Sequence, residues 1–404
     1  MAFRRIAAIA AALAAAVPAS ALAAGAARAE VACADTVAPG RITTEAPYEN
    51  RLYDLARLAP LADGTGVRVA VVDSGVDAAH PQLKGRVATG RDFLRGNPDG
   101  RQDCIGHGTG VAGIIAAAQV GDAPFHGLAP GATIVPVRIS EQDQAAGTSA
   151  GDKGTSAAFA YAIDFAADPA GGHAQVINLS LVMTEDDSRV RQAVERALDR
   201  GVVVVAAVGN NGEPQHGNPT PYPAAYPGVI GVGAIGADGQ RAAYSQHGDY
   251  VDVMAAGDHV TVAALHAGQT TAQGTSYAAP FVAATAALLK QRFPGLTPAQ
   301  VTQRIIATAD PAPGGRRSDE YGYGLLNPYR ALTETLTPGV PAPSAPGVTR
   351  SDDPGALALQ ERRDRSRDMA LLVAGAGAGL VTLAGILTAA VRRGRRRGWR
   401  PGTW

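Results

Sequence analysis

Cysteine is scarce in this chain, whose 404 residues include only Cys33 and Cys104. With two thiols and no closely spaced histidines, the sequence offers no cluster with the ligand spacing of a zinc site. No acidic loop has the pattern of a calcium site either. We therefore expect a protein without a metal ion or another cofactor.

The net charge of the whole sequence is zero, since 36 basic residues balance 36 acidic ones. The balance hides an asymmetry: residues 1–29 hold three arginines, residues 392–404 hold six, and neither segment has an acidic residue. Residues 30–391 are left with 27 basic and 36 acidic residues, a net charge of −9. An acidic body argues against nucleic-acid binding.

The amino-terminal 29 residues have the pattern of a secretory signal peptide. Two arginines precede the apolar stretch 6–17, and small residues with two alternative Ala-x-Ala cleavage sites follow. An uncleaved anchor is the alternative, but the apolar stretch is shorter than the roughly 20 residues that span a bilayer. Export favours oxidation, so we expect a disulfide between Cys33 and Cys104. Cys33 lies in a proline-broken extension, residues 30–63.

The carboxyl-terminal part has the pattern of a membrane anchor. Residues 336–368 form a Pro-rich linker and a charged juxtamembrane segment, and residues 369–391 then run without a charge. That run is long enough to span a membrane, and the preceding linker disfavours a core helix. The six arginines of residues 392–404 should stay in the cytoplasm, which places the body outside. We expect a single-pass protein of the cell membrane.

Between residues 64 and 335, short β-branched runs alternate with stretches suited to helices. Composition, with 46% hydrophobic and 18% charged residues, is that of a globular protein. The alternation predicts an α/β fold with a mainly parallel sheet, whose ligand site lies at the carboxyl ends of the strands. The expected strands are 67–72, 134–137, 176–179 and 202–207, and the expected helices are 111–118, 156–167, 188–200, 276–293 and 298–309.

Ser276 stands in a Gly-Thr-Ser turn just ahead of Ala-rich, helix-forming sequence. Unpaired N–H groups and the positive end of the helix dipole favour developing negative charge at such a place, which suits a nucleophile. Pro280 is tolerable because the first helical turn has no internal N–H bonds to lose. The structural alternative for Ser276 is that it only caps the helix.

Three more polar residues stand where strands end or helices begin. Asp73 ends a buried strand, His107 opens a small-residue helix, and Asn210 lies in a Gly-bounded turn after another strand. Each has a plain structural alternative, as a turn cap, a surface or structural histidine, and a left-handed turn residue. The presence of all these residues at such positions favours a shared catalytic role over the separate structural alternatives.

The chemistry of a serine hydrolase needs these residue types. Ser276 is a weak nucleophile at neutral pH and needs a base, which His107 can supply near its ordinary pKa of about 6.5. Asp73 can hold the imidazole in the right tautomer. Asn210 and the N–H of Ser276 can donate to the tetrahedral oxyanion.

Four stretches resemble the signature blocks of the subtilisin-like serine proteases: Val-Val-Asp73-Ser-Gly-Val-Asp, Gly-His107-Gly-Thr-Gly-Val-Ala-Gly, Val-Gly-Asn210-Asn-Gly and Gly-Thr-Ser276-Tyr-Ala-Ala-Pro. The order Asp, His, Ser along the chain is that of subtilisin. The resemblance covers about residues 67–332. It implies a three-layer subtilisin-like fold and a serine endopeptidase.

The whole layout is similar to that of the mycosins, membrane-anchored proteases of the type VII secretion systems of actinobacteria. This resemblance implies a secreted protein substrate and a type VII secretion membrane complex as partners. The alternative function, from a different class, is a structural subunit that stabilises the secretion complex, with proteolysis secondary.

Two departures from the subtilisin pattern bear on specificity and maturation. Leu181, Val182 and Met183 stand where subtilisins usually carry glycines that line the substrate cleft, so we expect a reshaped pocket and a restricted substrate set. The extension is too short for a folded chaperone prosegment, so it can remain in the mature protein. Because Cys104 lies three residues before His107, the disulfide would tie this extension to the rim of the active site.

Overall fold

The computed structural model describes residues 33, 38–95, 99–121, 123–142, 153–313, 315, 317–336 and 391–393. The expected signal peptide, most of the linker and, but for residues 391–393, the expected span and basic tail lie outside these ranges. Within the ranges, no helix is both long and apolar enough to cross a membrane.

A seven-stranded sheet forms the centre of the molecule, in the order β2-β3-β1-β4-β5-β6-β7. Every neighbouring pair in it is parallel. The strands are β1 (Arg68–Asp73), β2 (Arg91–Asp92), β3 (Thr133–Arg138), β4 (Val176–Leu179), β5 (Val203–Ala207), β6 (Ile230–Ile235) and β7 (Val253–Ala256). The continuous apolar runs of β5 and β6, buried at every residue, reflect burial on both faces. The predicted α/β fold with a mainly parallel sheet is confirmed.

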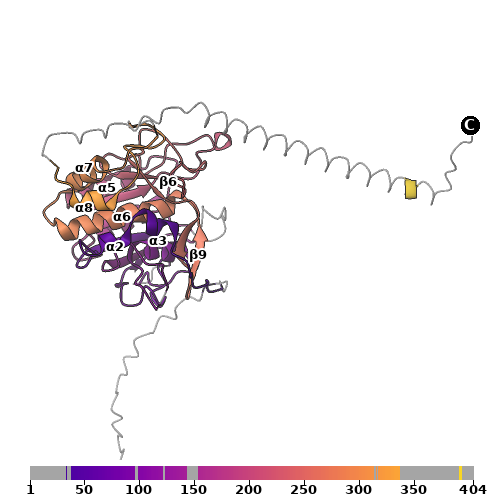
Figure 1. Ribbon diagram of the computed structural model, residues 1–404, viewed down its shortest axis with the longest axis horizontal. Coiled ribbons are helices and arrows are strands. Elements are labelled where there is room, and N and C mark those ends of the chain that lie inside the picture. Colours follow the sequence, from indigo (N-terminus) through magenta and orange to yellow (C-terminus); the bar gives the residue numbers. More distant parts are fainter. Residues whose placement is uncertain are drawn as a thin grey trace, which may run out of the picture.

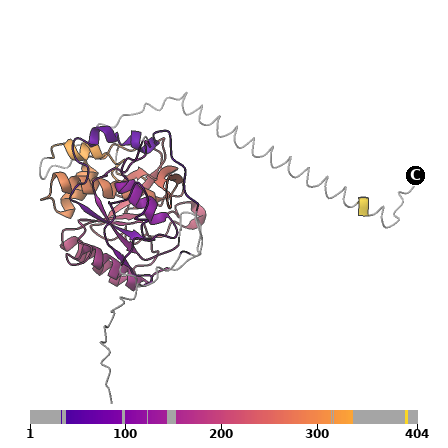
Figure 2. The same ribbon diagram turned by 90° about the horizontal axis from the view of Figure 1, so that it is seen from below.

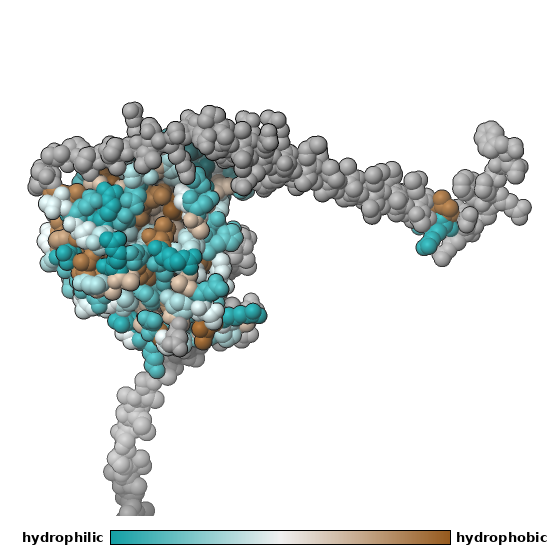
Figure 3. All heavy atoms as spheres, viewed as in Figure 1, coloured by the Kyte–Doolittle hydropathy of each residue, from teal (hydrophilic) through white to brown (hydrophobic). Residues whose placement is uncertain are grey.

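Helices cover both faces of the sheet and make three layers (Figures 1 and 2). One face carries α4 (Ser156–Ala167) and α5 (Ser188–Asp199), which pack side by side. The other carries α3 (His107–Ala116) and α6 (Thr275–Arg292), with α7 (Pro298–Ala307) and α8 (Pro328–Thr333) beside them. The outer surface in the view of Figure 3 carries mostly hydrophilic residues with hydrophobic ones scattered among them.

Helix α6 differs from the expectation at Pro280. The helix begins at Thr275, so Pro280 is its sixth residue and lies in the second turn, past the first. The N–H that proline lacks would bond the carbonyl of Ser276, four residues earlier. The hydroxyl of Ser180 donates to that carbonyl instead, at 2.6 Å. The argument that Pro280 loses no internal bond was therefore wrong, and a strand-end serine satisfies the freed carbonyl.

The amino-terminal extension packs on the domain through two short helices, α1 (Tyr48–Leu52) and α2 (Leu55–Leu58). Glu49 is 1% exposed, and its Oε1 accepts from the N–H of Thr261 at 2.8 Å. The hydroxyl of Tyr53 accepts from Ala256 N at 2.8 Å, and that of Tyr48 donates to Asp258 O at 2.9 Å. These bonds flank Gly257, whose carbonyl accepts from Gly274 N at 2.8 Å. The extension thus supports the turn that carries Ser276.

Burial of Glu49 makes the stability of this contact depend on pH. Loss of water around the carboxyl raises the pKa of Glu49, against the backbone N–H bonds that lower it. The folded pKa then lies above the unfolded one, so the protein loses stability as pH rises from below about 4.3 through the folded pKa. Glu49→Gln stays neutral and keeps an acceptor for Thr261. We expect its melting temperature, relative to that of the unsubstituted protein, to increase as pH rises from about 4 and to level off above the folded pKa.

The matched control is Glu45→Gln, an exposed carboxyl of the same extension. Its difference from the unsubstituted protein should stay flat over the same range, as calorimetry at several pH values will show. A flat difference for Glu49→Gln as well would mean that Glu49 is not held in a desolvated site.

Candidate active site

Four polar residues predicted from the sequence meet at one edge of the sheet. Asp73 is the last residue of β1, and Asn210 follows the end of β5. His107 is the first residue of α3, and Ser276 is the second residue of α6. The carboxyl ends of parallel strands share one edge of the sheet, which brings Asp73 and Asn210 together. Helix α6 follows a segment outside the parallel sheet, so the packing of α6 on the sheet brings Ser276 to this edge.

His107 and Asp73 form a buried hydrogen-bonded pair. His107 Nδ1 lies 2.7 Å from Asp73 Oδ1, and the side chains are 6% and 1% exposed. A carboxylate only accepts hydrogen bonds, so Nδ1 must carry the proton and donate it. In the neutral ring the lone pair is then on Nε2, the state that a general base needs. The His107 ring also packs against the Tyr277 ring, with 5.0 Å between their centroids.

Asp103, which the sequence reading missed, holds the segment that leads into His107. Its carboxylate accepts from Ser74 Oγ and from the N–H groups of Ile105, Gly106 and Thr109, each at 2.9 Å, and from Thr109 Oγ1 at 2.6 Å. The carboxylate is buried, and this burial raises the pKa of Asp103. An acid four residues before the motif histidine was the available signal. These bonds fix the start of α3, and with it the imidazole.

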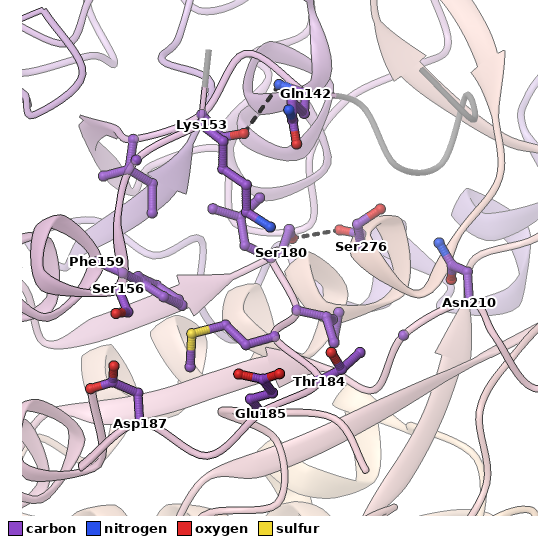
Figure 4. A pocket seen from close by; sticks show the side chains of 18 of the residues that line it. Gln142, Lys153, Ser156, Phe159, Ser180, Thr184, Glu185, Asp187, Asn210 and Ser276 are labelled. Atoms are coloured by element: carbon purple, nitrogen blue, oxygen red, sulfur yellow. Dashed lines mark hydrogen bonds between the residues drawn. The ribbon is translucent and has the colours of Figure 1, made fainter. Parts of the chain in front are cut away.

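Ser276 is 5% exposed, and its Oγ has no hydrogen-bond partner among the residues that the structure describes. Catalytic hydrogen bonds often form fully only when substrate is bound, so a buried hydroxyl at this place suits a nucleophile. Its backbone carbonyl is held by Ser180 Oγ, as Figure 4 shows. The hydroxyl therefore projects from a fixed backbone.

Hydrogen bonds from Thr275 fix the orientation of the Asn210 side chain. Its Oδ1 accepts from both the N–H and the hydroxyl of Thr275, each at 2.9 Å. With the oxygen so placed, the amide NH₂ must point the other way, and in Figure 4 the nitrogen is directed toward Ser276. Thr275 Oγ1 also accepts from Gly209 N at 3.0 Å. Asn210 thus presents a preorganised donor beside the serine.

A cavity of about 610 Å³ opens on these residues. Half-buried Leu181, Val182 and Met183 line it, packed against the two hydrophobic cores. Glu185 also lines the cavity, at the side away from Ser276 (Figure 4). No three His, Cys, Asp or Glu side chains in the described part of the chain are grouped as metal ligands.

The structure joins Cys33 to Cys104 by a disulfide with an S–S distance of 2.01 Å. Arg138, which is 1% exposed, donates from Nη2 to Cys104 Sγ at 3.4 Å and pairs with Asp92 at 3.6 Å. The disulfide thus holds Cys33 of the extension against Cys104, which lies three positions before His107 in the sequence.

Comparison with known proteins defines the class. The model of the subtilase family, Peptidase_S8, matches residues 64–324. The chain belongs to the subtilase family, and it is a serine endopeptidase of the Asp/His/Ser type.

Within this family the chain is similar to mycosins. It is 35% identical to Mycosin-1 of Mycobacterium tuberculosis, over 80% of this chain and 81% of that protein. It is 36% identical to Mycosin-4 of the same organism, over 92% and 87%. A solved structure described as the serine protease MycP1, an essential component of the type VII (ESX-1) secretion system, matches with a TM-score of 0.63 and 31% identity, over 74% of this chain and 91% of that one.

Proposed function

We propose that Asp73, His107 and Ser276 are the catalytic triad and that Asn210 donates to the oxyanion. The observation that carries this assignment is the 2.7 Å bond from His107 Nδ1 to Asp73, which sets the imidazole tautomer at an edge shared with Ser276. The oriented side chain of Asn210 is a second observation that supports the assignment, because its bonds to Thr275 leave the amide NH₂ to donate to the oxyanion.

In the proposed reaction, Ser276 Oγ attacks the peptide carbonyl carbon as its proton passes to His107 Nε2. Asn210 Nδ2 and the N–H of Ser276 bind the oxyanion that forms. The carbon–nitrogen bond breaks when the imidazolium gives its proton to the leaving amine, and the acyl group stays on Ser276. Water then attacks the ester with His107 again as the base, which releases the acid and restores the serine.

The substrate is proposed to be a secreted protein that is cut at few sites. Leu181, Val182 and Met183 place side chains along the cavity where subtilisins usually carry glycine, so fewer residues fit. A restricted set is more consistent with processing than with general digestion.

The proposed setting is the outer side of the cell membrane, at a type VII secretion membrane complex. Support comes from the similarity to Mycosin-1 and to MycP1, and from the uncharged run 369–391 with its six following arginines. The run would anchor the chain once across the membrane, with the peptidase domain outside.

The test is hydrolysis of a peptide library by the purified full-length chain and by its Ser276→Ala variant. Cleavage at a few sequences by the first protein alone supports the proposal. Cleavage that persists in the variant would assign the activity elsewhere. In cells, secretion that requires the protein but persists in the Ser276→Ala variant would favour the structural role over proteolysis.

A further inference from the structure

A second cavity, of about 420 Å³, is also lined by His107. Among the residues that the structure describes, His107 alone lines both cavities. The first cavity holds Asn210 and Ser276, so the acyl half of a substrate belongs there. The leaving amine of the substrate must contact the imidazole to receive its proton. The part of the substrate peptide that follows this amine therefore continues past His107. The second cavity therefore faces the leaving half of the peptide.

One wall of this cavity comes from the extension. Ala38, Pro39 and Gly40 line it, opposite Leu265 and Tyr277 of the peptidase domain. Ala38 and Pro39 are exposed residues of this lining. The site is thus built jointly by a segment that precedes the family match and by residues inside it.

Backbone hydrogen bonds fix this wall in place. The antiparallel hairpin β8 (Val260–Ala263) and β9 (Gln269–Ala272) receives the extension at its edge. Gly40 N donates to Ala267 O at 2.9 Å, and Arg41 exchanges bonds of 3.0 and 2.8 Å with Gln269. A segment paired in this way is held by its backbone, independent of its side chains.

Two further contacts limit movement of the wall. A Cβ on Gly40 would lie 2.4 Å from Gln269 O and 2.6 Å from Ala264 Cβ, so the backbones meet as closely as glycine allows. On the other side of the wall, the disulfide joins Cys33 to Cys104, next to Ile105, which also lines the cavity. The wall is anchored at both sides.

The lining has no Asp, Glu, Lys or Arg side chain among the residues that the structure describes. A charged substrate side chain that entered would lose water without gaining a counter-ion, which is costly. Most of the lining residues are apolar, with alanine the commonest, and the polar ones include two threonines and Gln273.

We infer that this cavity is a leaving-side subsite, shaped by the extension, that selects an uncharged side chain shortly after the cleaved bond. This inference rests on the proposed function. It gives the extension a direct part in specificity besides packing. The extension acts by placing Ala38 and Pro39 against the substrate, with no part in bond breaking.

The test places a charge on the wall at its exposed residue. Peptides with a common acyl half carry Ala, Lys or Asp at the first two positions after the cleaved bond. The unsubstituted chain should prefer the uncharged peptides. Ala38→Glu should shift the kcat/KM ratio toward the Lys peptide and Ala38→Lys toward the Asp peptide, with about a tenfold difference in the ratio between the two variants.

Ile42→Glu and Ile42→Lys are the matched controls, since Ile42 belongs to the same segment, is 71% exposed and does not line the cavity. They should leave the ratio unchanged. A ratio that stays constant in the Ala38 variants, while all proteins hydrolyse the uncharged peptide, would overturn the inference. Failure of the unsubstituted chain to cleave any peptide would instead contradict the proposed function.

Discussion

Replacement of Asp73 by asparagine is expected to lower kcat about 10⁴-fold while KM changes little. Asp73 is buried at the end of β1 and its Oδ1 accepts the proton on His107 Nδ1 at 2.7 Å. The amide keeps the shape but can present a donor to Nδ1, which favours the wrong tautomer, and it does not stabilise the imidazolium. Loss of about 10⁴ is the magnitude known for this change in a serine protease of another fold. Steady-state kinetics on a cleaved peptide will measure it.

Asp77→Asn is the matched control because Asp77 lies four residues further along the same motif. Its carboxylate accepts from the N–H groups of Ala79 and His266, each at 2.9 Å, and an amide oxygen can still take one of these bonds. We expect kcat within a few-fold of the unsubstituted chain. An Asp73→Asn variant that is folded and within tenfold of normal activity would contradict the role of Asp73.

Replacement of Asn210 by alanine is expected to lower kcat about 10²- to 10³-fold, again with little change in KM. The oxyanion forms only along the reaction path, so its donor stabilises the transition state and leaves substrate binding largely unaffected. The magnitude is the one known for loss of an oxyanion donor in subtilisin, a relative of this chain, and is carried over as an expectation. Single-turnover kinetics will separate acylation from binding.

Asn211→Ala provides the control, since Asn211 is the neighbouring amide and lines the same cavity. In contrast to Asn210, it has no bond to Thr275 that would turn its NH₂ toward Ser276. Equal losses in the two variants would show that general disturbance of the turn, and not a missing donor, explains the effect.

Much of the fold was predictable because most elements follow local rules. The expected strand 176–179 and helix 156–167 coincide with β4 and α4, the latter capped by Thr155, whose side chain accepts from Ala158 N. Helix α3 begins at His107, four residues earlier than expected. The glycines at 108 and 110 disfavour a helix by propensity, but a Cβ at Gly108 would lie 2.1 Å from Gly75 O, so close packing requires glycine there.

Strands β6 and β7 were not predicted, and for β6 the reason is similar. Strand β6 contains Gly231 and Gly233, which favour a turn when the sequence is read alone. In the structure, a Cβ at Gly231 would lie 1.9 Å from Tyr250 O, and one at Gly233 would lie 2.5 Å from Met254 Sδ. These neighbours come from elsewhere in the chain, so tertiary contact decides the residue type.

The same distinction applies to the site. Asp73, His107, Asn210 and Ser276 stand at strand and helix ends and in motifs that resemble the subtilisin signature blocks, and this joint pattern selected them as site candidates. Asp103 supports His107 from four residues away, but other supporting residues act across long separations. Ser180 holds the carbonyl of Ser276, 96 residues away. Neither this contact nor the cavity wall supplied by the extension leaves a local pattern.

The most direct test of the central claim is labelling of the purified chain with a fluorophosphonate, which reacts with activated serines. If Ser276 is the nucleophile activated by His107, the probe should attach to Ser276 alone, as mass spectrometry of the labelled peptide will show. Labelling should vanish in Ser276→Ala and fall strongly in His107→Ala. A folded chain that does not react, or that reacts equally when Ser276 is alanine, would contradict the account.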